Sequence, residues 1–281
     1  MRRTLYLLAA FLAPTLGAGS SAASAQSKVV ILSTTTSTQD SGLLDVLVPM
    51  FERTSGYSVK TVSVGTGQAL ALAARGEADV ALVHASSLEK QYVADGKMHN
   101  RRLVMYNDFV LIGPAEDPAG IKGMAKVAEA LKKVAGARAR FVSRGDKSGT
   151  HVLELGLWKL AGVEPKGAWY IESGQGMGQT LVIANERAAY TLTDRATFLA
   201  FQQRVKLPIL VEKDRLLLNV YSVMEVNPAN GPRVNAAGGK AFADFMVSPA
   251  TQAAIKSFGV SMYGQALFVP IAGKTEEEIG G

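Results

Sequence analysis

Hydrophobic positions along this chain alternate between short continuous runs and helical spacings. Residues 28–33 form an apolar run typical of a buried strand, and 40–53 carry apolar side chains at helical spacing, closed by Gly56. The alternation then repeats, with strands expected at 58–64 and 79–83 and helices at 68–75 and 86–94. This order predicts a parallel sheet with helices on both faces, an α/β fold.

The same alternation resumes in the second half of the chain, between two unusually long extended runs. The runs cover 103–113 and 216–226. Between them we expect helices at 122–136, 148–160, 177–185 and 194–201 and strands at 140–143, 169–171 and 188–192. Two helices, at 236–246 and 249–258, follow the second run.

We interpret the two extended runs as crossings between two doubly wound lobes. Lobe one is then 26–107 plus 222–281, and lobe two is 108–221. The alternative is one continuous sheet with long strands. Paired crossings form a hinge, and hinges serve closure around a ligand.

The first 25 residues have the pattern of a cleaved secretory signal. Arg2 and Arg3 precede an apolar stretch from Leu5 to Leu16, and Ala23-Ser24-Ala25 is an A-x-A cleavage site. The alternative, a membrane anchor, requires a longer apolar run of about 20 residues. Cleavage removes two arginines and no acid, which lowers the formal charge from +6 to +4. We therefore expect an exported protein of the periplasm.

Composition excludes several kinds of chemistry. The chain has no cysteine, which excludes disulfides and thiolate metal sites, and its three histidines show no metal-binding spacing, so we expect no metal site and no cofactor. Lysine and arginine are dispersed, so no nucleic-acid footprint is present. The mild positive charge suits an anionic ligand.

Small polar residues and glycines follow most of the expected strands. Ligands of open parallel sheets bind beyond the carboxyl ends of the strands, where these loops lie. The loops are 34–38, 65–67, 84–87, 143–150 and 174–180. Each precedes a helix, so each offers free backbone N–H groups together with hydroxyl donors.

These loops share hydrogen-bond donation, and Arg144 adds a guanidinium fork that matches two oxygens of one anion. Together they predict a pocket for a small oxyanion. The candidate ligand-binding residues are Thr35, Thr36, Ser37, Thr66, Arg144, Ser148, Thr150 and Thr180. Asp146 is expected to be the partner of Arg144.

Several of these segments resemble a known family. The loop Arg144-x-x-x-Ser148-Gly149-Thr150 resembles the anion-clamping loop of periplasmic phosphate-binding proteins. The run from Thr34 to Leu44 is closer still to the tungstate-binding proteins of ABC transporters, the TupA family. The segments 64–70, 78–85 and 102–109 fit the same family in order.

The resemblance implies a two-lobed type II periplasmic binding protein that delivers tungstate to an inner-membrane ABC permease. It places the family's TTTS-type run on Thr34–Ser37 and its anion-contacting arginine on Arg144. We expect such a protein to act as a monomer, and not as an enzyme.

Hydrogen phosphate carries a proton, so a selective phosphate site needs an acceptor. In the phosphate-binding proteins that this chain resembles, an aspartate just past the third strand supplies the acceptor. At that place this chain has His84-Ala85-Ser86-Ser87, with no acid. A site of donors suits a deprotonated dianion: tungstate, molybdate or sulfate. Tungstate and molybdate have nearly the same size and shape, so the choice between them depends on the resemblance alone.

Three other functions stay open at this point. One is a site for another oxyanion, such as sulfate or phosphate. Another is a hydrolase with a serine or threonine nucleophile, for which His151 is a base candidate, although no G-x-S-x-G elbow occurs. The last is a sensor that reports ligand occupancy to a membrane kinase.

Overall fold

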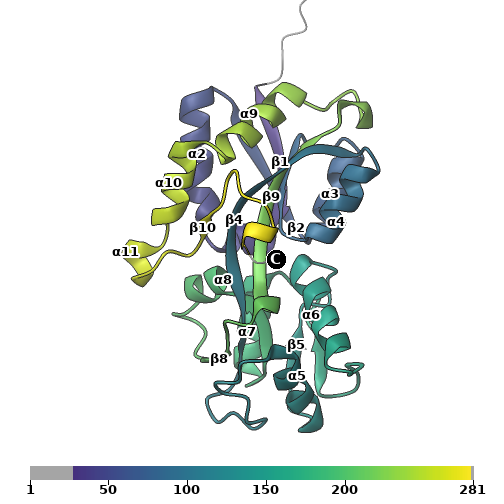
Figure 1. Cartoon of the computed structure of the whole chain (residues 1–281), viewed down its shortest axis with the longest axis vertical. Coiled ribbons are helices and arrows are strands. Elements are labelled where there is room, and N and C mark those ends of the chain that lie inside the picture. Colours follow the sequence, from purple (N-terminus) through teal and green to yellow (C-terminus); the bar gives the residue numbers. More distant parts are fainter. Residues whose placement is uncertain (1–27, 280–281) are drawn as a thin grey trace, which may run out of the picture.

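Two long strands, β4 (Met98–Ile112) and β9 (Leu218–Val226), run side by side between the two halves of the molecule (Figure 1). They are antiparallel, with Asn107 opposite Asn219. The computed structural model describes residues 28–279, so the predicted signal peptide lies outside the described residues. Residues 98–108 of β4 lie along β9, and Met105 and Tyr106 also pair with β10 (Val269–Pro270). The last four residues of β4 pair with two strands of the other half.

The upper half of Figure 1, called lobe one below, contains a mixed sheet. Its strand order is β10-β4-β9-β3-β1-β2. The predicted parallel arrangement is confirmed for β1 (Val29–Thr35), β2 (Ser58–Val64) and β3 (Val80–Val83). β9, which was expected only as a crossing between the lobes, runs antiparallel to β3 because the chain returns from the other half in that direction.

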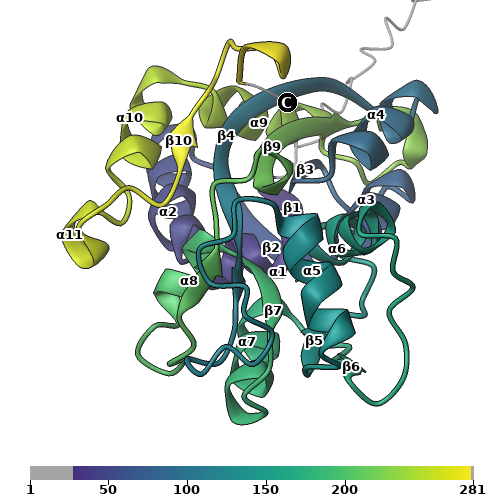
Figure 2. The same cartoon turned by 60° about the horizontal axis from the view of Figure 1, so that its bottom comes forward.

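Side chains of β3 alternate between two cores, as the period of two in a strand requires. Val80 and Leu82 join one core cluster, and Ala81 and Val83 join another. The first core is covered by α2 (Leu43–Ser55), α9 (Ala236–Met246) and α10 (Pro249–Ser257), and the second by α3 (Thr66–Ala74) and α4 (Ser86–Ala94). Figures 1 and 2 show α2 and α10 on one side of the sheet and α3 and α4 on the other.

The lower half, called lobe two below, repeats this arrangement on a smaller scale. Its strands are β5 (Phe141–Ser143), β6 (Tyr170–Glu172), β7 (Thr191–Asp194) and β8 (Ile209–Val211), and its helices are α5 (Val127–Gly136), α6 (Gly149–Leu160), α7 (Met177–Glu186) and α8 (Arg195–Ala200). Phe109 and Leu111 of β4 enter one core with Trp158, and Val110 and Ile112 enter a second. The lobe boundaries at 107/108 and 221/222 stay predictions.

The hydroxyl-rich run at 34–38 differs from the loop expected there. Thr34 and Thr35 complete β1, and a short helix, α1 (Thr36–Asp40), begins at once. The Thr35 side chain caps that helix by accepting a hydrogen bond from the Thr38 N–H at 3.2 Å. The chain therefore turns from strand to helix with no intervening loop, which fixes each hydroxyl of the run.

Two other elements begin later than their patterns predict. The helix expected from residue 122 begins at Val127, whose N–H donates to Asp214 at 2.9 Å, after Gly123 at a φ of 78°. The strand expected from Ala188 begins at Thr191, since Ala188 has a φ of 45°. Positive φ angles interrupt regular structure in both segments.

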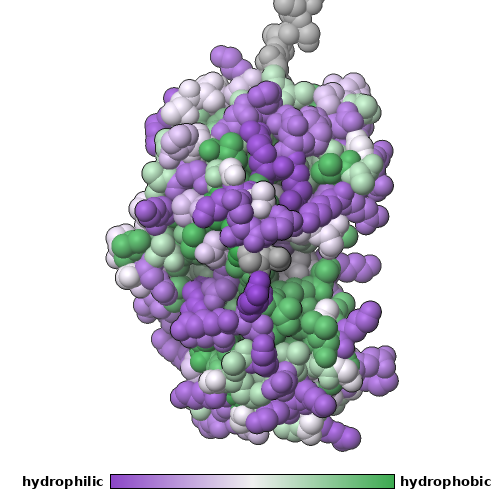
Figure 3. Space-filling model, in the orientation of Figure 1, coloured by the Kyte–Doolittle hydropathy of each residue, from purple (hydrophilic) through white to green (hydrophobic). Residues whose placement is uncertain are grey.

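An apolar patch lies on the surface of lobe two, visible as green spheres at the lower right of Figure 3. It includes Val152, Leu155 and Leu160 of α6 and the neighbouring Leu216, all exposed. Val152 also lines a cavity that reaches lobe one, so the patch borders the junction of the lobes.

None of the helices within residues 28–279 has the length and apolar character of a membrane span.

Candidate anion-binding site

Strand-to-helix junctions from both lobes meet at the boundary between the lobes. A Cβ on Gly149, the first residue of α6, would lie 3.1 Å from Thr66 Oγ1 and 3.3 Å from His84 Cε1. A Cβ on Gly176 would lie 3.3 Å from the Thr36 side chain. Glycine at these positions lets the backbone of lobe two approach lobe one closely. The loops expected to converge therefore do so.

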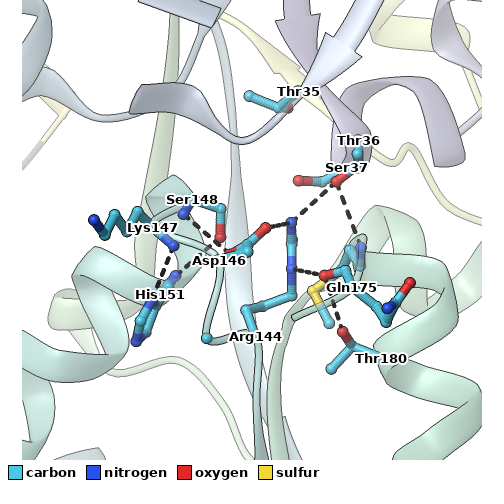
Figure 4. A network of polar contacts seen from close by, with 12 residues as sticks. Thr35, Thr36, Ser37, Arg144, Asp146, Lys147, Ser148, His151, Gln175 and Thr180 are labelled. Carbon is cyan, nitrogen blue, oxygen red and sulfur yellow. Dashed lines mark hydrogen bonds and ion pairs between the residues drawn. The ribbon is translucent and has the colours of Figure 1, made fainter. Parts of the chain in front are cut away.

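Arg144 directly follows β5 and is buried, with 1% of its surface exposed. Its Nε donates to the Gln175 carbonyl at 2.8 Å, and its Nη2 donates to Thr36 Oγ1 at 3.1 Å and to the Asp146 carboxylate (Figure 4). Nη1 is buried and has no partner among the described residues. Two guanidinium nitrogens were expected to donate to one anion. Only Nη1 is available for this, because protein acceptors occupy Nε and Nη2.

Two threonine hydroxyls share this property with Arg144 Nη1. Thr66 Oγ1, on lobe one, and Thr150 Oγ1, on lobe two, are buried without a hydrogen-bond partner in the described part of the chain. Burying a polar group without a partner costs roughly 1–3 kcal/mol, so folded proteins rarely do it. An acceptor-rich ligand would satisfy all three groups together.

The hydroxyls from Thr34 to Ser37 have distinct contacts. Thr34 Oγ1 donates to the Leu82 carbonyl at 2.7 Å, and Thr35 Oγ1 lies 2.7 Å from Thr38 Oγ1. Ser37 Oγ lies 3.4 Å from His84 Nε2. Thr34 therefore orders the junction, and both Thr35, at 3.1 Å from His84 Nε2, and Ser37 face the loop that follows β3.

Helix α1 joins the lobes through several hydrogen bonds. Thr36 Oγ1 accepts from Arg144 and, at 3.4 Å, from the Met177 N–H. Asp40 accepts from the Gly178 N–H at 3.0 Å, and burial raises the pKa of its carboxyl. These contacts hold the lobes closed on one another.

Ser148 and Thr180, the remaining predicted ligand residues, bond within lobe two. Ser148 Oγ caps α6 by accepting from the His151 N–H at 3.2 Å. Thr180 Oγ1 lies 2.8 Å from Ser173 Oγ and donates to the Gln175 carbonyl at 3.3 Å. Thr180 thereby supports the loop whose Gln175 carbonyl holds Arg144.

Asp146 is confirmed as the partner of Arg144, and its other oxygen accepts from the Ser148 N–H at 3.0 Å. His84 and Asp40 were missed as site residues by the sequence patterns. His84 directly follows β3 in a strand-to-helix loop, and that position was the signal available for it. Asp40 had no such signal because its partner comes from the other lobe.

His151 is unsuited to the base role considered from the sequence. Its Nδ1 accepts the Lys147 N–H at 3.0 Å, and burial lowers its pKa. Its Nε2 has no partner among the described residues, and its backbone N–H donates to Ser148 Oγ, which caps α6. This arrangement builds a helix start and aims no base at a nucleophile.

Two cavities lie near charged groups. One, of about 360 Å³, spans the lobe boundary and is lined by His84, Gly149 and Asn219. A larger cavity, of about 740 Å³, lies against β4 in lobe one. Three of its cations have carboxylate partners: Lys90 with Glu276, Arg101 with Glu89 and Glu276, and Arg102 with Glu225 and Asp244. The fourth, Lys274, has no ion pair among the described residues, but all the residues that line this cavity belong to lobe one, so it offers no groups from both lobes.

Comparisons with known proteins agree with this geometry. A family model described as a PBP superfamily domain matches residues 20–250. The chain is 47% identical over 247 residues to the tungstate-binding protein TupA of Peptoclostridium acidaminophilum, covering 87% of this chain and 86% of that protein. It is 48% identical over 267 residues to a putative ABC transporter anion-binding protein of Haloferax volcanii, covering 93% of this chain and 78% of that protein.

Solved structures give the same result. The tungstate ABC transporter structure from Geobacter sulfurreducens is 51% identical, with a TM-score of 0.75, over 82% of this chain and 98% of that one. The tungstate-binding protein TupA from Desulfovibrio alaskensis G20 is 46% identical, with a TM-score of 0.71, over 87% of this chain and 99% of that one. The chain therefore belongs to the PBP superfamily and, within it, to the TupA family of substrate-binding proteins of ABC transporters, a family of binding proteins with the type II periplasmic-binding-protein fold.

Proposed function

We propose that this protein captures tungstate, or molybdate, in the periplasm and delivers it to the inner-membrane permease of an ABC transporter. It would do so as a monomer, exported by its N-terminal signal and without a cofactor. The names of the related proteins support the ligand and the transporter. The observation that carries the proposal is the set of three buried, unpartnered polar atoms: Arg144 Nη1, Thr66 Oγ1 and Thr150 Oγ1.

The charge and hydrogen-bonding capacity of the site favour a deprotonated dianion over hydrogen phosphate. The guanidinium of Arg144 can only donate, and a hydroxyl can donate to an oxyanion oxygen. Of the carboxylates near Arg144, Asp146 already accepts from Arg144 and Ser148, Asp40 accepts from Gly178, and Asp194 accepts from Thr197. The proton of hydrogen phosphate would therefore have to displace one of these donors from a carboxylate, which a fully deprotonated dianion does not require.

Both lobes supply the proposed ligand groups, so binding would favour the closed arrangement. Thr66 belongs to lobe one, and Arg144 and Thr150 belong to lobe two. A ligand that touches both sides stabilises the closed state by its differential affinity. The permease would then read closure as ligand occupancy.

Isothermal titration calorimetry with tungstate, molybdate, sulfate and phosphate tests the proposal. We expect sub-micromolar dissociation constants for the first two anions and much weaker binding of phosphate. A titration in which sulfate or phosphate binds and tungstate does not would reassign the ligand. Absence of sub-micromolar binding for both tungstate and molybdate would overturn the proposed function.

A further inference from the structure

The imidazole of His84 lies fully inside the junction of the lobes and has potential partners at both ring nitrogens. Nε2 is 3.1 Å from Thr35 Oγ1 and 3.4 Å from Ser37 Oγ. On the other side lies the Asn219 side chain, which lines the same cavity as His84. His84 Nδ1 and Asn219 Oδ1 are both buried, and neither forms a hydrogen bond within the described residues.

Neighbouring groups fix the orientation of the ring. The Tyr221 ring lies 4.6 Å away and the Phe109 ring 6.3 Å away, measured between centroids. The amide of Asn219 donates to Asn107 at 2.8 Å and to Tyr221 at 3.0 Å, which leaves its Oδ1 as an acceptor. Nδ1 of His84 is therefore best satisfied as an N–H donor.

The protonation state of His84 decides what the hydroxyls can do. With the N–H on Nδ1, a neutral ring has an acceptor at Nε2, which takes a hydrogen from Thr35 or Ser37. A protonated ring instead donates from both nitrogens. The hydroxyl oxygens then accept from Nε2, and their hydrogens are free to point toward an oxyanion.

Positive charge and burial keep the ring neutral before a ligand binds. Desolvation and the Arg144 guanidinium lower the pKa of His84 to about 4. The other charged or titratable groups close to the ring, or on the cavity that it lines, are Tyr221, Glu89, Arg215 and Glu276. Asp194 lies behind Asn219 and Asn107, where it accepts from the Asn107 amide at 3.4 Å, and burial raises its pKa to about 6. Glu89 is paired with Arg101, and Glu276 with Lys90 and Arg101, so neither carboxylate favours the imidazolium strongly.

A bound dianion reverses this balance. The single positive charge of Arg144 is already matched by Asp146, so two further negative charges enter a buried site with no free counter-charge. An opposite charge within about 4–6 Å moves a pKa by about 1 to 3, and a dianion carries two such charges, which together can raise it by about 3 or more. A rise of that size would carry His84 above neutral pH.

On the basis of the proposed function, we propose that His84 takes up one proton from solvent when the oxyanion binds, which places an imidazolium between Asn219 and the hydroxyls of Thr35 and Ser37. The proton comes from the buffer and forms the new N–H bond at Nε2. No other covalent bond changes. His84 is thus a positioning residue that turns the hydroxyl run toward the ligand.

The second buried histidine is a poor alternative for this proton. His151 Nδ1 accepts the Lys147 N–H at 3.0 Å, so protonation there would break an existing hydrogen bond. His99 is outside the site, where its Nε2 lies 3.4 Å from Glu225 and 43% of its side chain is exposed. His99 therefore serves as a control.

Proton uptake predicts how affinity depends on pH. The complex holds one proton more than the free protein at pH values above about 4, so affinity falls as pH rises. The limit is about tenfold per pH unit, reached while the bound imidazole stays protonated. We expect this trend for tungstate between pH 6.5 and 8.5.

Calorimetry in buffers of different ionisation enthalpy measures the proton directly. Tungstate is titrated at pH 7 in PIPES, HEPES, imidazole and Tris, and the slope of the binding enthalpy against buffer enthalpy gives the number of protons taken up. We expect a slope near one for the wild type and for His99→Gln. We expect a slope near zero for His84→Gln, with tungstate binding about 10- to 100-fold weaker.

The outcomes separate the two proposals. Tungstate binding with a slope near zero in the wild type, or a slope near one that persists in His84→Gln, overturns the role of His84 and leaves the proposed function intact. Absence of tungstate and molybdate binding overturns the proposed function, and this inference with it. If His84→Gln fails to fold, ¹⁵N NMR of the histidine rings in the wild type decides, since tungstate should convert one neutral ring to imidazolium.

Discussion

The two faces of the cleft differ in how they carry charge. Apart from Asp40, whose carboxylate accepts from Gly178, lobe one presents neutral groups: the hydroxyls of Thr35, Ser37 and Thr66 and the uncharged ring of His84. Lobe two presents the buried ion pair of Arg144 and Asp146. The difference indicates a division of roles, in which lobe two supplies a guanidinium held in place by Asp146 and lobe one supplies hydroxyl donors held in fixed directions.

Removing the positive charge from lobe two should have the largest effect. We expect Arg144→Ala to weaken tungstate binding by about 10²- to 10⁴-fold, because a buried dianion that loses its charged partner loses of order 3–5 kcal/mol. Calorimetry measures this loss. Arg144→Lys should be intermediate, since it keeps the charge and loses the planar fork.

Arg195→Ala is the control for this variant. Arg195 pairs with Asp108 and Glu212, away from the convergent loops, so its loss should leave affinity within about threefold. Equal affinities for Arg144→Ala and the wild type would show that Arg144 is outside the site.

The two lobes also differ in how a buried carboxyl group makes the free energy of unfolding depend on pH. Glu154 of lobe two accepts hydrogen bonds only from neutral groups, Ser143, Trp158 and Tyr170, and burial raises its pKa to about 7. The unfolded chain releases this proton near 4.5, so folded stability falls as pH rises from about 4.5 to about 7. The loss amounts to about 3 kcal/mol.

We expect Glu154→Gln to remove this loss, since a neutral amide has no charge to bury. Thermal unfolding at pH 5 and pH 8 should show a fall in Tm of about 5–10 °C in the wild type and a smaller fall in the variant. Glu89 of lobe one is the contrast: it pairs with Arg101 at 2.8 Å, so Glu89→Gln should lower Tm at both pH values. Parallel pH profiles for the wild type and Glu154→Gln would contradict the assignment.

The unpartnered hydroxyls test whether both lobes touch the ligand. Thr66→Val and Thr150→Val keep the shape of the side chain and remove a donor, so each should weaken binding about 5- to 30-fold, or 1–2 kcal/mol. Thr191→Val is the matched control, because the buried Thr191 hydroxyl already donates to the Val142 carbonyl at 2.7 Å. If the control variant weakens tungstate binding as much as the other two, the lack of a protein partner does not identify the hydroxyls that contact the ligand.

Asp146→Asn should give the smallest change, in the opposite direction. The amide keeps an acceptor for the Ser148 N–H and removes a negative charge next to Arg144. We expect tungstate affinity to rise about three- to tenfold, because less repulsion opposes the dianion. A fall in affinity would mean that the carboxylate acts chiefly by orienting Arg144.

Much of this fold follows from patterns that are local in the sequence. The apolar runs at β1, β2 and β3 and the helical spacings of α2 and α6 predict the elements correctly. The antiparallel direction of β9 could not be predicted, because it depends on how the chain returns from lobe two. The late start of α5 likewise depends on Asp214, 87 residues away in the chain.

The site was predictable to a similar extent. Hydroxyls and glycines after strands indicate a donor-rich junction, since strand ends meet at one edge of a sheet. Which donors have protein partners was not predictable, because that depends on contacts such as Gln175 with Arg144 and Thr36 with Met177. Thr66 and Thr180 are both threonines near a helix start, yet only Thr66 has an unpartnered hydroxyl.

If one tetrahedral dianion lies between the lobes, anomalous X-ray scattering will locate it there. Crystals of the protein grown with tungstate, measured at a tungsten absorption edge, locate the metal atom of the ligand independently of the phases. We expect one strong peak whose surrounding oxygens lie within hydrogen-bond distance of Arg144 Nη1, Thr66 Oγ1 and Thr150 Oγ1. A single peak in the cavity lined by Lys90, Arg101 and Arg102 would contradict the account.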